Sequence, residues 1–108
     1  MKSKCYRGAR LDHKPGIPGD LVVFVASEDG GQYLLPHAEL HSPTGFEWGY
    51  GGAGSADLAY SILVDYLGDT ERSERLHQDF KRAFIVPLDR SSSWTLEDDT
   101  IARWLAEH

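Results

Sequence analysis

The sequence is poor in several residue types and patterns, and each shortage excludes a class of protein. It holds one cysteine, Cys5, among 108 residues, so it has no disulfide within the chain and lacks the thiolates of a structural zinc site. No apolar run approaches the roughly 20 residues that span a bilayer. The charged N-terminus is not followed by the apolar segment of a signal peptide. We therefore expect a cytoplasmic protein, in a bacterium or an infected host cell, with no membrane partner.

Basic residues are missing from the whole middle of the chain. Neither Lys nor Arg occurs between Lys14 and Arg72, and the formal net charge is −6. A chain of this kind is not expected to bind nucleic acid in general. An anion bound in the middle segment would need backbone amides, the N-terminal arginines, the C-terminal half, or a second copy of the chain in a homo-oligomer.

The order of the apolar patterns predicts the fold class. Strands are expected at residues 5–10, 21–25, 32–35 and 80–86, a loop at 11–19, and helices at about 56–67 and from Thr95 onward. Gly68 is expected to end the first helix, and residues 69–77 are expected to form a short helix or turn with Asp69 or Thr70 as its cap. The second and third strands are joined by a short turn rich in Asp and Gly, which predicts a hairpin. We predict one domain over residues 1–108. It is an α+β fold in which a small antiparallel β-sheet of about four strands has two main helices packed on one face.

The helix expected near 56–67 has the clearest pattern in the chain. Its apolar residues recur every three or four positions and predict a stripe that faces the core. The polar residues Asp57, Ser61 and Asp65 are expected on the solvent face. Tyr60 and Val64 flank the stripe, and we expect them to be half exposed and available to a partner.

Residues 45–55 hold five of the chain's 11 glycines and lead directly into this helix. Ser55 is expected to cap the helix, since Ser is a preferred N-cap residue. A glycine-rich turn before a helix N-terminus is suited to bind an anion, because its N–H groups and the positive end of the helix dipole face the turn. The alternative is that the glycines only let an irregular loop pack tightly.

Three aromatic residues alternate within the same stretch. Phe46, Trp48 and Tyr50 fall on one side of an extended segment. They either fill the core or provide a surface on which a base stacks.

Known phosphate-binding motifs match this stretch poorly. The six residues 49–54 satisfy G-x-G-x-x-G, but no buried strand precedes them, as a dinucleotide fold requires. A P-loop is excluded because no Lys follows Gly54. Arg7 and Arg10 are three residues apart on a predicted edge strand. The two arginines either keep a strand edge solvated and so discourage aggregation, or form a fork of two guanidinium groups that binds phosphate.

Catalytic and metal-binding patterns are weak. His37 and His41 are four residues apart, but no helix is predicted there to bring them together, so we expect no metal site. No nucleophile and base stand at a persuasive spacing. We expect neither an enzyme nor a cofactor.

The run over residues 41–59 contains the distinctive motif His-Ser-Pro-Thr-Gly-Phe-Glu-Trp-Gly-Tyr-Gly-Gly-x-Gly. Together with residues 6–10 and 77–81 it resembles a family of small uncharacterised domains in bacteria, plasmids and phages. The resemblance covers about residues 6–105. It implies a small protein of a mobile element with no established chemistry. In size, acidity and its glycine–aromatic turn, the chain is also similar in setting to phage counter-defence proteins, including sponges that sequester cyclic nucleotide signals.

Two functions follow as hypotheses. The first is a binder that sequesters a small nucleotide, with phosphate at the glycine turn, a base on an aromatic ring and charge from an arginine. The expected ligand-binding residues are Arg7, Arg10, Phe46, Trp48, Tyr50, Gly51, Gly52, Gly54 and Ser55. The second is an inhibitor that docks on a host defence enzyme through its acidic surface and aromatic loop.

Overall fold

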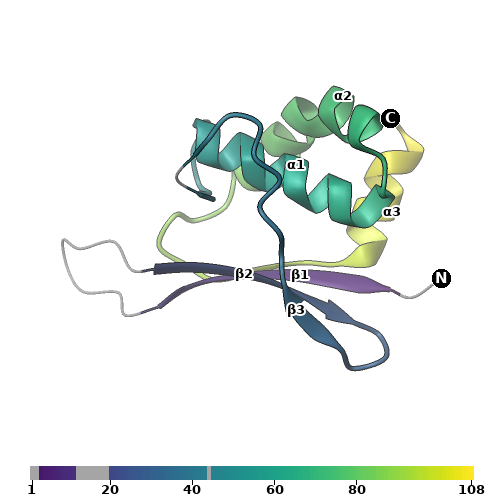
Figure 1. Ribbon diagram of the computed structural model, residues 1–108, viewed down its shortest axis with the longest axis horizontal. Helices are drawn as coiled ribbons and strands as arrows, with labels where there is room; N and C mark the ends of the chain where they lie inside the picture. The colour runs from purple at the N-terminus through teal and green to yellow at the C-terminus, as the bar shows by residue number, and fades with distance from the viewer. Residues whose placement is uncertain (1–2, 12–19, 44) are drawn as a thin grey trace. The chain divides into compact units, whose positions relative to one another are not determined.

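The structure is a computed structural model that describes residues 3–11, 20–43 and 45–108 (Figure 1). The chain divides into two compact units. Residues 1–34 and 93–108 form one, which we call the sheet unit, and residues 35–92 form the other, the helical unit. The predicted α+β class is confirmed, because the chain combines a four-stranded antiparallel sheet with α-helices.

The sheet unit is built on one long antiparallel pair. Its strands are β1 (Lys4–Leu11), β2 (Asp20–Ser27), β3 (Gln32–Leu34) and β4 (Trp94–Leu96), in the spatial order β3-β2-β1-β4. β1 and β2 pair over their full lengths without a bulge, from Lys4 opposite Ser27 to Leu11 opposite Asp20. The first three strands confirm the prediction. Most of the loop expected at 11–19 lies outside the described residues.

The hairpin between β2 and β3 follows the turn chemistry of its residues. Gly30 has φ 90°, which a residue with a side chain rarely adopts. The turn is closed by the N–H of Ser27, which donates to the carbonyl of Gly31 at 2.8 Å, and by the N–H of Gly30, which donates back to Ser27 at 3.0 Å. Figure 1 shows β3 running back beside β2. The expected hairpin is confirmed.

The start of the last helix was predicted wrongly. The residues expected to begin it form β4, in which Trp94 pairs with Gly8 and Thr95 with Arg7 of β1. The close approach needs glycine, because a Cβ on Gly8 would come within 2.2 Å of the Trp94 indole. Helix α3 (Asp98–Ala106) begins after this strand with Glu97 as its N-cap. The fourth strand of the sheet is therefore residues 94–96, and not 80–86.

The helical unit is an all-helical hairpin with a long leading loop. Helix α1 (Ala53–Leu67) ends at Gly68, whose φ of 66° is left-handed. Helix α2 (Thr70–Phe80) begins at the expected cap, where the Asp69 side chain accepts the N–H of Arg72 at 3.1 Å.

Residues 80–86 are helical, which corrects the predicted strand. α2 continues into a π-helical turn, η1 (Lys81–Ile85). Phe80 and Ile85 are fully buried, and the ring of Phe84 lies 4.9 Å from that of Phe80. This turn aligns the apolar side chains with the end of α2, so their burial favours helix over the β propensity of the segment.

Helix α1 is buried on more than one face. Its expected stripe is buried at Leu58, Ala59, Ile62 and Leu63. The opposite face is covered as well, because Asp57 is 0% and Ser61 1% exposed. The prediction that these two face solvent is wrong. Tyr60, expected to be half exposed, is only 9% exposed.

Candidate functional site

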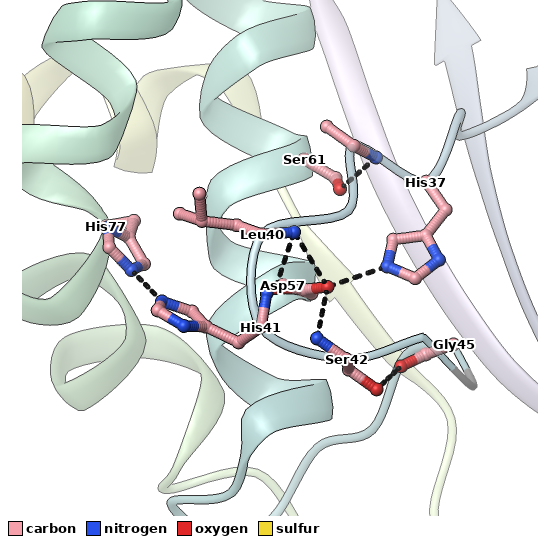
Figure 2. A network of polar contacts seen from close by, with 9 residues as sticks. His37, Leu40, His41, Ser42, Gly45, Asp57, Ser61 and His77 are labelled. Atoms are coloured by element: carbon pink, nitrogen blue, oxygen red, sulfur yellow. Dashed lines mark hydrogen bonds and ion pairs between the residues drawn. The ribbon is translucent and has the colours of Figure 1, made fainter.

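The polar centre of the helical unit is the carboxylate of Asp57 in the second turn of α1. Residues 35–43, which we call the histidine loop, fold over it (Figure 2). Its Oδ1 accepts the N–H of His41 at 2.7 Å and its Oδ2 that of Ser42 at 2.9 Å. The N–H of Leu40 lies 3.3 and 3.2 Å from the two oxygens. Three successive backbone donors therefore converge on one buried anion.

Two opposed effects set the pKa of Asp57. Burial is the largest and raises the pKa, because a low-dielectric environment disfavours the charged form. The hydrogen bonds from His37 and from the amides of Ser42, His41 and Leu40 lower it, and together they outweigh burial. The pKa therefore lies below its ordinary value of 3.8, and the buried group is a carboxylate at neutral pH.

His37 completes the ring of donors around the carboxylate. Its Nε2 lies 2.8 Å from Oδ2 of Asp57, so this nitrogen carries a hydrogen, and in the neutral ring Nδ1 presents a lone pair. The imidazole is 26% exposed and lies 4.8 Å from the ring of Phe46. An imidazole oriented by a carboxylate is suited to accept a proton. Among the described residues, however, no hydroxyl or thiol is hydrogen-bonded to His37.

His41 and His37 do not pair with each other. His37 binds Asp57, whereas the ring of His41 faces His77 of α2, with the two Nε2 atoms 3.0 Å apart (Figure 2). Within the part of the chain that the structure describes, no three His, Cys, Asp or Glu side chains lie close enough to hold one metal ion.

Helix α1 begins earlier in the glycine stretch than predicted, and with a different N-cap residue. The helix begins at Ala53 with Gly52 as its N-cap, and no side chain caps it. Ser55, expected to be the cap, lies inside the first turn and is 0% exposed. Its hydroxyl has no hydrogen-bond partner among the described residues. The first turn, which is described in full, carries no acidic side chain.

Two of the glycines are required by tight packing. Gly49 has φ 86°, its N–H donates to the carbonyl of Ile85 at 3.0 Å, and a Cβ there would lie 2.8 Å from the backbone of Arg90. A Cβ on Gly54 would come within 3.0 Å of Glu47. At these positions the glycines serve the packing of the loop. A Cβ on Gly51 would meet nothing within 4 Å, so that position is open.

The three alternating aromatics do not form one surface. Trp48 is 0% exposed, so a base could reach its ring only if the loop opened. Phe46 is half-buried against His37. Only Tyr50 is exposed, at 40%.

Tyr50 lies beside the start of α1, and the guanidinium group of an arginine lies over its ring. Its ring covers Gly52, where an added Cβ would lie 2.4 Å from Cε2 of the ring. The guanidinium carbon of Arg90 lies 4.7 Å from the ring centroid. Arg90 could not be predicted as a partner of Tyr50, because forty residues separate the two and no local pattern links them.

The two N-terminal arginines belong to the sheet unit. The predicted edge strand is wrong, because β1 pairs with β2 on one side and with β4 on the other. Arg7 and Arg10 are an odd number of residues apart on a regular strand, so their side chains point to opposite faces. They do not form a common fork.

Arg7 lies in a mixed charge environment. It lines an open groove of about 460 Å³ in the sheet unit. The charged residues of this groove are Lys4, Arg7, Glu28, Glu97, Asp98 and Asp99. Carboxylates outnumber cations there, which disfavours an anionic ligand.

The fold and the site define a small α+β protein whose leading loop is held by an internal carboxylate. The chain belongs to a family of unknown function, DUF6166, whose family model matches residues 6–107. No curated protein and no solved structure matched the chain in the same comparisons. Over the described residues, every helix is too short or too polar to cross a bilayer. The expected membership of an uncharacterised family is confirmed, and proposals on function rest on the geometry.

Proposed function

We propose that this protein binds a small phosphate-bearing nucleotide at the N-terminus of α1 and sequesters it without chemical conversion. The observation that carries the proposal is the position of Tyr50. Its side chain is partly exposed, the Arg90 guanidinium lies over its ring, and it stands beside a helix start that has no capping side chain. In a phage or other mobile element, such a binder would act in counter-defence by removing a nucleotide immune signal.

The phosphate would occupy the helix start. The first N–H groups of a helix have no acceptor within it, and at this end the bond from the N–H of Ala56 to the carbonyl of Gly52 measures 3.1 Å. The amide before it at Ala53, an exposed residue, is the kind of donor that an anion uses at a helix N-terminus. No carboxylate in the first turn opposes an anion, and the negative charge of Asp57, in the second turn, is stabilised by its own hydrogen-bond donors.

The base would stack on Tyr50. One face of that ring is covered by Arg90, and the 40% exposure of the residue leaves room for a planar ligand. Base–aromatic stacking contributes about 1–3 kcal/mol. The guanidinium adds the positive charge that residues 15–71 lack. The proposal therefore rests on Tyr50 and Arg90, in place of Trp48 and the N-terminal arginines.

Calorimetric titration with cyclic di- and trinucleotides, ADP-ribose variants and NAD tests the proposal. We expect one of these ligands to bind. Tyr50→Ala should weaken its binding roughly 5- to 150-fold, the equivalent of one stacked base. Arg90→Gln should also weaken binding, and this effect should shrink in high salt.

Arg7→Gln serves as the matched control, since it removes the same charge from the other unit. We expect it to leave the affinity unchanged. Absence of heat and of thermal stabilisation with every ligand would remove the proposal. A loss of affinity in Arg7→Gln equal to that in Arg90→Gln would place the site elsewhere.

A second candidate function is inhibition of a host defence enzyme by docking. The edge strand β3 favours it, because Leu34 is 69% and Tyr33 39% exposed, and both line a shallow surface hollow. An edge strand can accept an extended segment of a partner. The neighbouring turn carries Glu28 and Asp29, which suits a basic partner segment. Leu34→Lys should abolish capture of such an enzyme from host lysate, and it should leave nucleotide binding intact.

A further inference from the structure

We propose that His41 and His77 form a binding site for one divalent transition-metal ion of the Zn²⁺, Ni²⁺ or Cu²⁺ type. Their Nε2 atoms face each other at 3.0 Å within the helical unit (Figure 2). Imidazole nitrogen is a preferred ligand of these metals. The site is separate from the proposed nucleotide site and does not depend on it.

His77 is already prepared as a ligand. Its Nδ1 is hydrogen-bonded to the backbone carbonyl of Glu74, one turn earlier in α2. A carbonyl only accepts, so Nδ1 carries the hydrogen and Nε2 presents its lone pair. The imidazole is 5% exposed, and its ring meets that of Tyr60 edge-on at 5.8 Å. A second partner that fixes the tautomer and orientation of the ring is typical of metal-ligating histidine.

His41 supplies the opposing ligand from the histidine loop. Its backbone N–H donates to Asp57 at 2.7 Å, which fixes the main chain at this position. Its side chain is on the surface, and its ring lies end to end with that of His77, with an angle of 25° between the two ring planes. The metal can therefore enter from solvent on the His41 side.

Without metal, the two rings are joined by one N–H···N hydrogen bond between their Nε2 atoms. Because Nε2 of His77 is the acceptor, Nε2 of His41 is the donor. On metal binding this hydrogen leaves Nε2 and His41 takes the Nδ1–H form, so both ligands are neutral and no net proton is released from the neutral pair. Two Zn–N bonds of about 2.0–2.1 Å at a tetrahedral angle place the nitrogens about 3.3 Å apart. The nitrogens need to move apart by only a few tenths of an ångström, and both rings must turn so that lone pairs that now lie along the line between the nitrogens converge on the metal.

Two histidines leave coordination positions for water. The carboxylate of Asp57 does not fill them, since it is occupied by the amides of the histidine loop and by His37. The site is consequently open rather than closed, and we expect binding in the micromolar range and not the much tighter binding of a four-ligand structural site.

Titration of Zn²⁺ and of Ni²⁺ into chelator-treated protein without a polyhistidine tag tests the inference, with no nucleotide present. We expect one metal per chain and selective shifts of the His41 and His77 imidazole signals in NMR spectra. His41→Ala, on the surface, should lower the affinity about tenfold or more. His77→Gln should do the same, and circular dichroism checks that this buried variant is folded.

His108→Ala is the matched control, because His108 is a surface histidine at the chain end stacked on Trp104. It should bind metal as the wild type does. The inference is overturned by absence of saturable binding up to millimolar metal, or by equal affinity in wild type and His41→Ala. Either result would show that the pair is only a hydrogen bond between two neutral rings, and it would leave the nucleotide proposal untouched.

Discussion

Replacing Asp57 by Asn tests whether one buried carboxylate holds the histidine loop in place. Asn has nearly the same shape, but one of its two terminal atoms becomes an NH₂ donor. In either orientation this donor faces a backbone N–H, that of His41 or that of Ser42, at positions now 2.7 and 2.9 Å from carboxylate oxygens. The substitution removes the charge and sets two donors against each other in the interior.

The expected loss follows from these contacts. A charge-assisted hydrogen bond contributes about 1.5–3 kcal/mol, and a buried donor left without an acceptor costs about 1–3 kcal/mol. We therefore expect Asp57→Asn to lower the free energy of unfolding by about 3–5 kcal/mol. This is a large part of the 5–15 kcal/mol typical of a small protein. With urea m-values of about 1–3 kcal/mol/M, the unfolding midpoint should fall by about 1 M or more.

Urea unfolding followed by tryptophan fluorescence, to which buried Trp48 contributes, measures this loss. Asp79→Asn is the matched control, because Asp79 is also ion-paired on a helix, 2.6 Å from Arg82, but both side chains are more than half exposed. The free energy of unfolding of this control should fall by less than about 1 kcal/mol. If Asp57→Asn loses no more than the control, the anchoring role is refuted.

Three further results are expected. The pKa of Asp57 is lower in the folded protein than its ordinary value, so its stabilisation is complete above about pH 4 and is lost as pH falls through the folded pKa. Urea midpoints should therefore fall more steeply below about pH 4 in wild type than in Asp57→Asn, and parallel curves would contradict this. Gly49→Ala should lower the melting temperature more than Gly30→Ala, because both residues have positive φ but only Gly49 also lacks space for a methyl group. Gly8→Ala should destabilise by about 1–3 kcal/mol in thermal unfolding, since Trp94 must move, and an unchanged melting temperature would show that the indole has room.

Elements defined by local chemistry were predicted from the sequence. The hairpin turn at Gly30 requires positive φ, and the cap at Asp69 requires a side-chain acceptor next to the helix start. Both requirements are met by residues adjacent in sequence. The stop of α1 at Gly68 is of the same kind.

The secondary structure of residues 80–86 could not be predicted from the residues of the segment alone. Its aromatic and β-branched residues suit a strand, and Pro87 bounds it in the manner of a strand end. Burial of Phe80 and Ile85 along an extension of α2 favours helix. The pairing partner of β1 is instead the short strand at Trp94, whose three residues carry too weak a pattern to be recognised.

Each candidate site also has one part that could be predicted from the sequence and one part that could not. The glycine stretch and the helix it opens were visible in the sequence, but their partners were not: Arg90 meets Tyr50, and His77 meets His41, only after the chain folds back.

By itself the sequence determined where the hairpin after β2 turns, where α1 ends and α2 begins, and that the middle of the chain has no cation of its own. Only the tertiary structure decided which faces of those elements meet solvent. Asp57 and Ser61 have the spacing of an exposed helix face, yet the histidine loop covers them and donates backbone N–H groups to their side-chain oxygens. The physical reason is that a polar side chain is equally compatible with water and with unpaired backbone donors, and the choice depends on whether a distant segment brings such donors to it.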